Sequence, residues 1–186
     1  LVDVSGHGVE PALLSVSVHN LLRSGTFEPA TLLEPGAVLT ELNRLFQTDT
    51  QDNHFFTIWY GVYEASTRTI RYASAGHPPA LSIAGSVELE YLSTTSIPVG
   101  VQEHADFETR SHAVPHGCDI VIYSDGAFEL DLHDDQQWSL AEFGEVCAGI
   151  AQKPDWTLDT LVADLQQRSA SGLFEDDCTL VRLHIP

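Results

Sequence analysis

Two segments near the start of the chain carry hydrophobic residues at helical spacing. The first runs from Pro11 to Ser24 and the second from Pro35 to Gln47. In both, apolar residues stand three and four positions apart, which is the period of an α-helix. Pro11 suits the first turn of its helix, where a missing N–H group costs nothing, and Gly25 ends that helix. We therefore expect two amphipathic helices here.

The middle of the chain has the composition of β-strands. Phe55 to Tyr63 is rich in aromatic and β-branched residues, and a short turn leads from it to a partner strand over Thr69 to Ala75. The polar stretch from Asp49 to Asn53 separates these strands from the preceding helix. Four short extended segments follow, over Ala80–Ile83, Val87–Leu92, Phe107–Val114 and Asp119–Tyr123. This succession predicts a meander of antiparallel strands.

The two ends of the chain complete the pattern. Leu1 to Val4 has the character of a buried strand that runs into a glycine turn. Two further helices are expected over Leu140–Ala151 and Leu158–Ser169, and a last strand over Cys178–Ile185. Strands that lie between pairs of helices along the chain, with no Gly-rich linker dividing them, predict a layered α+β fold.

Length and charge restrict the class of protein. The chain has 186 residues, which corresponds to one domain at about 150 residues per domain. Asp and Glu number 27 against 8 Lys and Arg, so the formal net charge is −19. Such a surface repels nucleic-acid phosphates and anionic membranes, because binding to either normally requires a basic patch. Nucleic-acid and membrane-surface partners are therefore not expected.

Cysteine usage and the start of the sequence point to a cytoplasmic fragment. Cys118, Cys147 and Cys178 are widely spaced and odd in number, which favours a reducing compartment over a disulfide framework. No apolar run approaches the ~20 residues of a membrane span, and no secretory signal is present. The chain begins at Leu1 and contains no Met. We therefore expect a single domain, residues 1–186, excised from a longer protein.

Acidic residues at the ends of predicted strands are the most informative pattern. Asp3 and Asp125 each follow an apolar strand and precede a glycine turn, whereas Asp176 and Asp177 precede the last strand. Three such strand ends are expected to converge on one edge of a sheet, where the carboxylates repel one another unless cations such as Mg²⁺ or Mn²⁺ neutralise them. Ordinary turn chemistry also explains each acid singly. A metal site and a set of unrelated turn residues both stay open at this point.

Five motifs occur in order along nearly the whole chain. They are Asp3-Val4-Ser5-Gly6-His7-Gly8, Tyr72-Ala73-Ser74-Ala75-Gly76-His77-Pro78-Pro79, Ile97-Pro98-Val99-Gly100, Tyr123-Ser124-Asp125-Gly126 and Asp176-Asp177-Cys178-Thr179-Leu180. Together they resemble the successive motifs of the metal-dependent (type 2C-like) serine/threonine protein phosphatases. The most similar branch is the phosphatase domain of the bacterial stage II sporulation protein E. The fold that this resemblance implies is a four-layer αββα sandwich, with two antiparallel sheets flanked by helix pairs.

The resemblance also implies a role for each matching residue. In the family, the aspartate that corresponds to Asp3 bridges two Mn²⁺ or Mg²⁺ ions, and the backbone carbonyl that corresponds to Val4 ligates one of them. Asp125 and Asp176 match the other carboxylates of the first metal site, with Asp177 as a neighbour. The implied reaction is hydrolysis of a phosphoserine or phosphothreonine monoester by metal-activated water, without a phosphoenzyme.

One family feature is absent from this sequence. Family members carry a further acidic ligand for the second metal on a strand upstream of the first motif, and the sequence begins too late to contain it. We therefore expect a domain that lacks its N-terminal strand or strands and whose activity as a fragment is open.

The histidines allow more than one interpretation. His7 either donates a proton to the leaving alkoxide or orients a phosphate-bound water, as a histidine that titrates near neutrality can, or it serves the packing of its glycine turn. His77, which precedes Pro78-Pro79, is expected to fix a strand-to-turn transition and not to contact substrate.

The main functional hypothesis is thus a bacterial signalling phosphatase. The resemblance implies a phosphorylated protein substrate such as an anti-sigma-factor antagonist, an attached sensor or receiver domain, and a homodimer as one mode of control. The alternative is an inactive, phosphatase-like adaptor that binds a signalling partner. A third hypothesis, an unrelated acidic module that binds Ca²⁺ or Mg²⁺, predicts metal affinity without hydrolysis.

Overall fold

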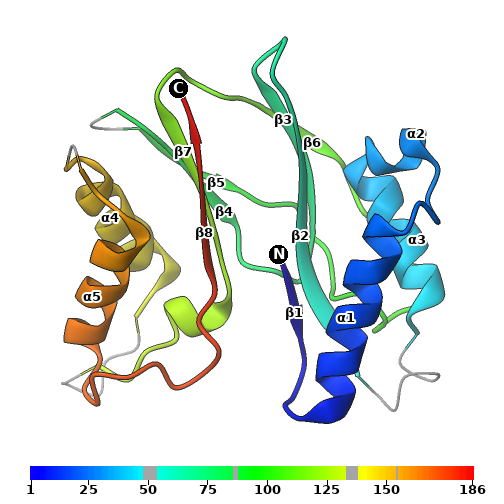
Figure 1. Cartoon of the computed structure of the whole chain (residues 1–186), viewed down its shortest axis with the longest axis horizontal. Helices are drawn as coiled ribbons and strands as arrows, with labels where there is room; N and C mark the ends of the chain where they lie inside the picture. Colours follow the sequence, from blue (N-terminus) through cyan, green and yellow to red (C-terminus); the bar gives the residue numbers. More distant parts are fainter. Residues whose placement is uncertain (48–53, 86–87, 133–137, 154) are drawn as a thin grey trace. The chain divides into compact units, whose positions relative to one another are not determined.

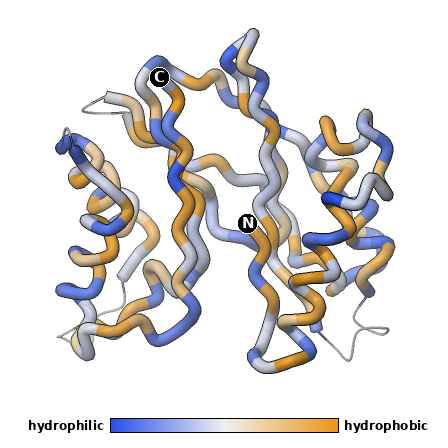
Figure 2. The backbone as a smooth tube through the Cα atoms, in the orientation of Figure 1, coloured by the Kyte–Doolittle hydropathy of each residue, from blue (hydrophilic) through white to orange (hydrophobic). Residues whose placement is uncertain are grey.

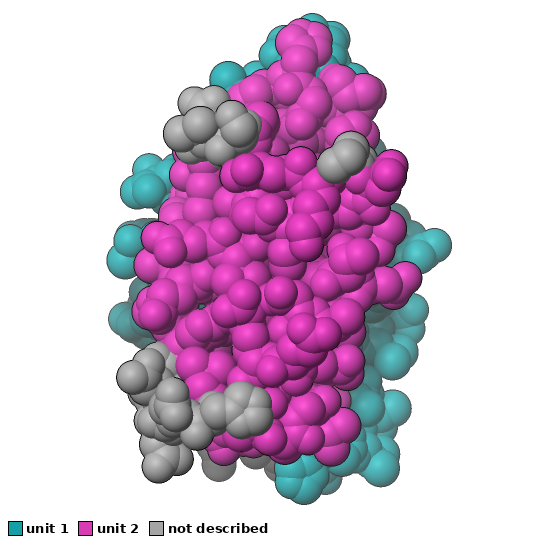
Figure 3. Space-filling model, turned by 90° about the vertical axis from the view of Figure 1, so that its left-hand side faces the viewer, with its two compact units in different colours: residues 1–79, 92–113 teal, residues 80–91, 114–186 magenta. Residues whose placement is uncertain are grey.

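The computed structural model describes residues 1–47, 54–85, 88–132, 138–153 and 155–186. They form two compact units, coloured separately in Figure 3: unit 1 comprises Leu1–Pro79 and Leu92–Ala113, and unit 2 comprises Ala80–Tyr91 and Val114–Pro186. Each unit contains an antiparallel sheet with helices of its own, so the predicted α+β class is confirmed. The stacking of both sheets in four layers stays a prediction.

Unit 1 is a sheet of four strands with helices on one side (Figure 1). The strands, in sheet order, are β1 (Val2–Val4), β2 (Phe56–Glu64), β3 (Thr69–Ala75) and β6 (Arg110–Ala113). The helices are α1 (Val9–Arg23), α2 (Pro29–Leu32) and α3 (Pro35–Leu45). The core forms where Val18 of α1 and Leu39 and Leu42 of α3 pack with Phe56 and Ile58 of β2, all nearly inaccessible to solvent.

Unit 2 repeats this plan with other elements. Its strands, in sheet order, are β5 (Glu88–Leu92), β4 (Ala80–Ala84), β7 (Cys118–Tyr123) and β8 (Leu180–Ile185). The helices are the short 3₁₀-helix η2 (Asp125–Ala127), α4 (Leu140–Ala151) and α5 (Leu158–Arg168). Figure 2 shows hydrophobic and hydrophilic positions interleaved along these helices. Phe143 of α4 and Leu161 and Leu165 of α5 supply the buried face that packs with Leu81 and Val121 of the sheet.

Side-chain caps fix where α4 and α5 begin. The hydroxyl of Ser139 accepts a hydrogen bond from the Glu142 amide, and the Glu142 carboxylate accepts one from the Ser139 amide. Thr157 and Thr160 form the same reciprocal arrangement at the start of α5. Both pairs satisfy N–H groups that a helix start leaves without partners.

The predicted meander is wrong, although most of its strands exist. After the β2–β3 hairpin, the chain supplies β4 and β5 to the second sheet, returns to pair β6 with β3, and then pairs β7 with β4. Hydrophobic alternation identifies a strand but not its partner, which explains the error. The single-turn helix α2 was not predicted, and Asp49–Asn53 lies outside the described residues. None of the helices in the described part of the chain is long and apolar enough to cross a membrane.

The turn that follows β3 holds a buried histidine. Gly76 has a φ of 63°, and a Cβ at this position would lie 2.6 Å from Cγ of Pro98, so glycine lets the two segments approach. His77 comes next and is 6% exposed. Its Nδ1 donates to the carbonyl oxygen of Pro78 over 2.9 Å, and its Nε2 has no hydrogen-bond partner among the described residues. Burial lowers the pKa of His77 from 6.5 to about 4.

This histidine makes the stability of the chain depend on pH. The unfolded chain takes up a proton at His77 near pH 6.5, whereas the folded chain does so only near pH 4. Above pH 6.5, His77 is neutral in both states and does not affect the free energy of unfolding. As the pH falls from 6.5 toward 4, the unfolded chain gains a proton that the folded chain does not, and the free energy of unfolding decreases by on the order of 3 kcal/mol in total. Replacement His77→Gln removes this proton uptake.

Urea unfolding at pH 7 and at pH 5 tests the effect. We expect the loss of unfolding free energy between these pH values to be smaller in His77→Gln than in the wild type by about 2 kcal/mol. His19→Gln, at an exposed position of α1, is the matched control and should retain the wild-type loss. An equal pH dependence in all three proteins would contradict the assignment.

Candidate functional site

Asp3 and Val4 are fixed in the sheet of unit 1. Asp3 lies in β1 directly opposite Thr57 of β2, and Val4 lies opposite Phe56. The hydroxyl Oγ1 of Thr57 is buried and has no hydrogen-bond partner among the described residues. Directly opposite side chains of an antiparallel pair lie on the same face of the sheet. The Asp3 side of β1 therefore carries a carboxylate beside an unsatisfied buried hydroxyl, which is an environment suited to a polar ligand.

The loop after β1 is held by Ser5 and His54. The Ser5 amide donates to the carbonyl oxygen of Phe55 over 3.0 Å, and the Phe55 amide donates to the Ser5 hydroxyl over 3.1 Å. His54 places Nδ1 3.2 Å from the Ser5 carbonyl oxygen and Nε2 3.5 Å from a carboxylate oxygen of Glu10. His7, in the same loop, is exposed. Sequence reasoning singled out His7 and missed His54, whose contacts arise only because β2 pairs with β1.

Asp125 and Asp176 come together at one end of the β7–β8 pair. The ladder runs from Cys118 opposite Ile185 to Tyr123 opposite Leu180, so the end of β7 lies beside the start of β8. Gly126 is packed against the backbone of the segment before β8, since a Cβ there would lie 2.8 Å from the Asp177 carbonyl oxygen and 3.1 Å from that of Asp176. The residue after Asp125 thus touches the backbone of Asp176.

The carboxylates of this pair have the chemistry of ligands for a hard cation. Asp125 accepts a hydrogen bond at Oδ1 from the Gly126 amide over 2.9 Å, and Asp176 accepts one at Oδ1 from the Asp177 amide over 2.7 Å. Across the described residues no basic side chain forms an ion pair with either carboxylate. Carboxylates without a basic partner, carried by two segments whose backbones touch at Gly126, have the oxygen chemistry that Mg²⁺ or Mn²⁺ prefers.

The prediction that three carboxylates lie on one edge of a single sheet is wrong, because their strands belong to two sheets. Asp3 belongs to the sheet of unit 1, whereas Asp125 and Asp176 flank strands of the sheet in unit 2. The expectation failed because strand ends were assigned to a single meander. In the described part of the chain, no group of three metal-binding side chains is assembled. A role for Asp3 together with the other two stays a prediction.

A cavity of about 480 Å³ adjoins Asp176 in unit 2. Phe128 and Trp138 contribute apolar walls, and Asp131 and Glu175 contribute carboxylates. Loss of hydration, together with the charge and a hydrogen bond of the neighbouring Asp131, raises the pKa of Glu175. Like charges that approach one another disfavour ionisation in this way. The space beside Asp176 is therefore polar and favours cationic groups over anionic ones.

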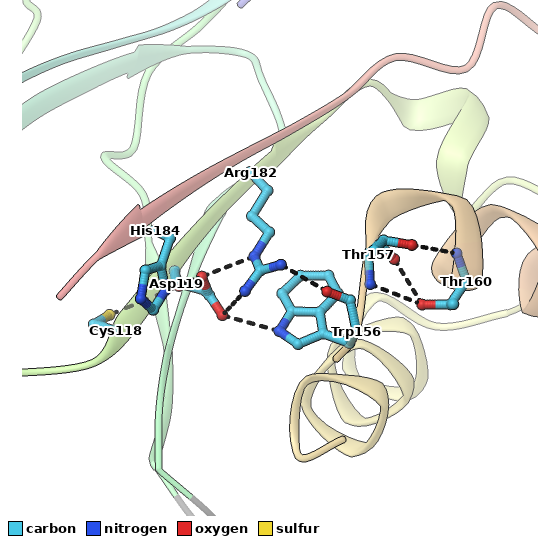
Figure 4. Close-up of polar contacts among 7 residues, drawn as sticks. All are labelled: Cys118, Asp119, Trp156, Thr157, Thr160, Arg182 and His184. Carbon is cyan, nitrogen blue, oxygen red and sulfur yellow. Dashed lines mark hydrogen bonds and ion pairs between the residues drawn. The ribbon is translucent and has the colours of Figure 1, made fainter. Parts of the chain in front are cut away.

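A second polar cluster, around Asp119, lies at the opposite end of β7 (Figure 4). Arg182 of β8 donates to both carboxylate oxygens of Asp119, over 2.8 and 3.0 Å. Trp156 Nε1 donates to Asp119 over 3.0 Å, and His184 Nδ1 lies 2.9 Å from the same carboxylate. The Arg182 guanidinium also stacks on the Trp156 ring at 3.8 Å and donates to the Trp156 carbonyl oxygen.

This cluster is structural. Burial by itself would raise the pKa of Asp119, but hydrogen bonds from Arg182 and His184 hold it below its ordinary value. The oxygens of Asp119 already accept hydrogen bonds from three side chains, so few of their lone pairs are available to a ligand. Sequence reasoning missed the cluster, because its members stand far apart in the chain and only the β7–β8 register and the segment before α5 bring them together.

Removal of the Asp119 charge should destabilise the protein strongly. Asp119→Asn leaves Arg182 partly buried and without its carboxylate, which costs about 3 kcal/mol of unfolding free energy. Asp164→Asn is the control, because Asp164 forms a partly exposed ion pair with Arg168 one helical turn away and such pairs contribute under about 1 kcal/mol. Urea unfolding at neutral pH measures both, and equal losses in the two variants would refute the structural role of Asp119.

Sequence comparison identifies the family of this chain. The sequence profile of the family described as Stage II sporulation protein E (SpoIIE) matches residues 1–186. The chain is 33% identical over 133 residues to the phosphoserine phosphatase RsbP of Bacillus subtilis (strain 168), an alignment that covers 69% of this chain and 32% of the relative. The chain spans about a third of the length of the curated relatives it matches.

Solved structures show the same fold. The SiaA PP2C domain of Pseudomonas aeruginosa superposes with a TM-score of 0.82 at 16% identity, over 100% of this chain and 73% of that one. RsbX in complex with magnesium superposes with a TM-score of 0.66 at 15% identity, over 100% of this chain and 79% of that one. With a family profile that matches from the first residue to the last, this chain belongs to the SpoIIE family.

Proposed function

We propose that this chain hydrolyses phosphoserine or phosphothreonine in a protein substrate with the help of Mn²⁺ or Mg²⁺. The observation that carries the proposal is the close approach of the backbone at Gly126 to that of Asp176, which brings together the segments that carry Asp125 and Asp176. Among the described residues, no basic side chain forms an ion pair with either carboxylate. A net charge of −19 makes such a pair costly unless a cation binds. The relative RsbP is named a phosphoserine phosphatase, which supports this reaction.

The metal ligands that we propose are Asp125 and Asp176 of unit 2, together with the carboxylate of Asp3 and the carbonyl oxygen of Val4 in unit 1. These are hard oxygen donors, and RsbX was solved with magnesium. A bound divalent cation supplies an acidified water and offsets charge on the phosphoryl oxygens.

The residues of this chain orient the carboxylates and provide a proton donor. The backbone amide of Gly126 orients Oδ1 of Asp125, and the backbone amide of Asp177 orients Oδ1 of Asp176. His7 is exposed on the glycine turn after Asp3 and is free to approach a substrate. We assign His7 the role of proton donor to the leaving serine or threonine oxygen.

The biological setting is proposed from the relatives. The family resemblance leads us to propose a phosphorylated bacterial regulatory protein, such as an anti-sigma-factor antagonist, as the substrate, and the relative RsbP is named a phosphoserine phosphatase. The resemblance also leads us to propose an attached sensor or receiver domain and control by homodimerisation. The cysteine pattern leads us to propose a cytoplasmic location.

Hydrolysis of p-nitrophenyl phosphate and of a phosphoserine peptide, each with and without Mn²⁺, tests the function. We expect Mn²⁺-dependent turnover in the wild type and a loss of at least about 100-fold in Asp125→Asn, because the amide gives the cation a neutral oxygen in place of a charged one. Asp159→Asn, at an exposed position in the first turn of α5, is the control and should keep full activity.

Two outcomes would contradict the proposal. Undiminished Mn²⁺-dependent turnover in Asp125→Asn, with the variant folded by circular dichroism, would exclude this carboxylate from the reaction. A wild-type chain that binds Mn²⁺ and hydrolyses neither substrate would favour the adaptor hypothesis.

A further inference from the structure

The hydroxyl of Ser124 joins the end of β7 to the segment that carries Asp176. Ser124 is 3% exposed and directly precedes Asp125. Its Oγ donates to the Asp177 carbonyl oxygen over 2.8 Å and accepts from the Thr179 amide over 2.9 Å. The Ser124 amide also donates to the Thr179 carbonyl oxygen over 3.0 Å. The ladder between β7 and β8 ends at Tyr123 and Leu180, so these bonds extend the pairing beyond the strands.

One residue separates this hydroxyl from a carboxylate of the candidate site. The carbonyl group of Asp177 accepts from Ser124, and the amide of Asp177 donates to Oδ1 of Asp176 over 2.7 Å. A shift of Asp177 would therefore move the group that orients the Asp176 carboxylate. Because Asp125 is joined to Ser124 by a peptide bond, the position of both carboxylates depends on the same hydroxyl.

We propose that Ser124 is a positioning residue for the Asp125–Asp176 pair and thereby sets the affinity of the chain for a divalent cation. The inference rests on the proposed function, since it takes this pair as metal ligands. Residues that orient metal ligands without touching the metal typically change affinity or activity by about 10- to 100-fold. Alanine at 124 would leave the carbonyl of Asp177 and the amide of Thr179 without their hydroxyl partner.

The chain contains a matched control in Ser74. This serine is 1% exposed and lies in β3 of unit 1. Its Oγ donates to the Thr94 carbonyl oxygen and accepts from the Thr94 amide, both over 3.1 Å. Ser74→Ala therefore removes a buried hydroxyl that makes the same two kinds of backbone hydrogen bond, and a further contact to the Thr94 hydroxyl, in the unit that does not contain Asp125 and Asp176. A purely structural effect of serine removal should appear equally in both variants.

The experiment compares the wild-type chain with Ser124→Ala and Ser74→Ala. Mn²⁺ affinity is measured by calorimetric titration and by electron paramagnetic resonance, and exchange of the Thr179 amide hydrogen is measured by NMR without metal. We expect Ser124→Ala to bind Mn²⁺ about tenfold more weakly or worse and to exchange the Thr179 amide faster. Ser74→Ala should bind as the wild type does. Excess Mn²⁺ should restore hydrolysis in Ser124→Ala but not in Asp125→Asn.

The possible failures are distinguishable. If the wild type binds Mn²⁺ and Ser124→Ala binds it equally well, the positioning role is overturned and the proposed function stands. If exchange at Thr179 does not change, the hydroxyl does not hold the segment, and the positioning role is again overturned. If both serine variants lose affinity alike, the effect is general destabilisation, and the positioning role is overturned. A wild-type chain without Mn²⁺ affinity overturns the proposed function, and the positioning role with it.

Discussion

Antiparallel pairing of β7 with β8 is the constraint on which the candidate site depends. An antiparallel pair necessarily places the end of one strand beside the start of the other. Asp125 follows β7 and Asp176 precedes β8, so the pairing of the two strands brings together two segments that are distant in sequence and that each carry a carboxylate. Gly126 then lets the two backbones approach to a distance that no side chain at that position would tolerate.

The two ends of this strand pair differ in how their carboxylates are compensated. At the end that contains Asp119, a buried carboxylate is compensated within the protein by the guanidinium of Arg182, with Trp156 and His184 completing its hydrogen bonds. At the end that contains Asp125 and Asp176, each carboxylate accepts a hydrogen bond from the backbone amide of the next residue, and within the described ranges neither forms an ion pair with a basic side chain. The first arrangement stabilises the fold, whereas the second leaves negative charge for a ligand to neutralise. The same strand pair therefore carries a structural cluster at one end and the proposed cation site at the other.

The sequence predicted the parts of this structure that depend on local pattern. Helical spacing identified α1, α3, α4 and α5, and aromatic and β-branched runs identified β2 and β3 with nearly correct bounds. The motifs around Asp3, Asp125 and Asp176 identified the family. Partner choice was not predictable: β6 returns to β3, and Asp3 belongs to a different sheet from Asp125. Contacts such as those of His54 and Asp119 depend on that pairing, so no local signal could reveal them.

We propose that Asp125 and Asp176 bind the same divalent cation. A double-mutant cycle of Mn²⁺ affinity, with Asp125→Asn, Asp176→Asn and the double variant, decides this point, because the effects of substitutions at residues that share a ligand do not add. Each single variant should lose most of the affinity, and the second substitution should then add little. Losses that simply add in the double variant would indicate two independent carboxylates and would exclude a shared cation.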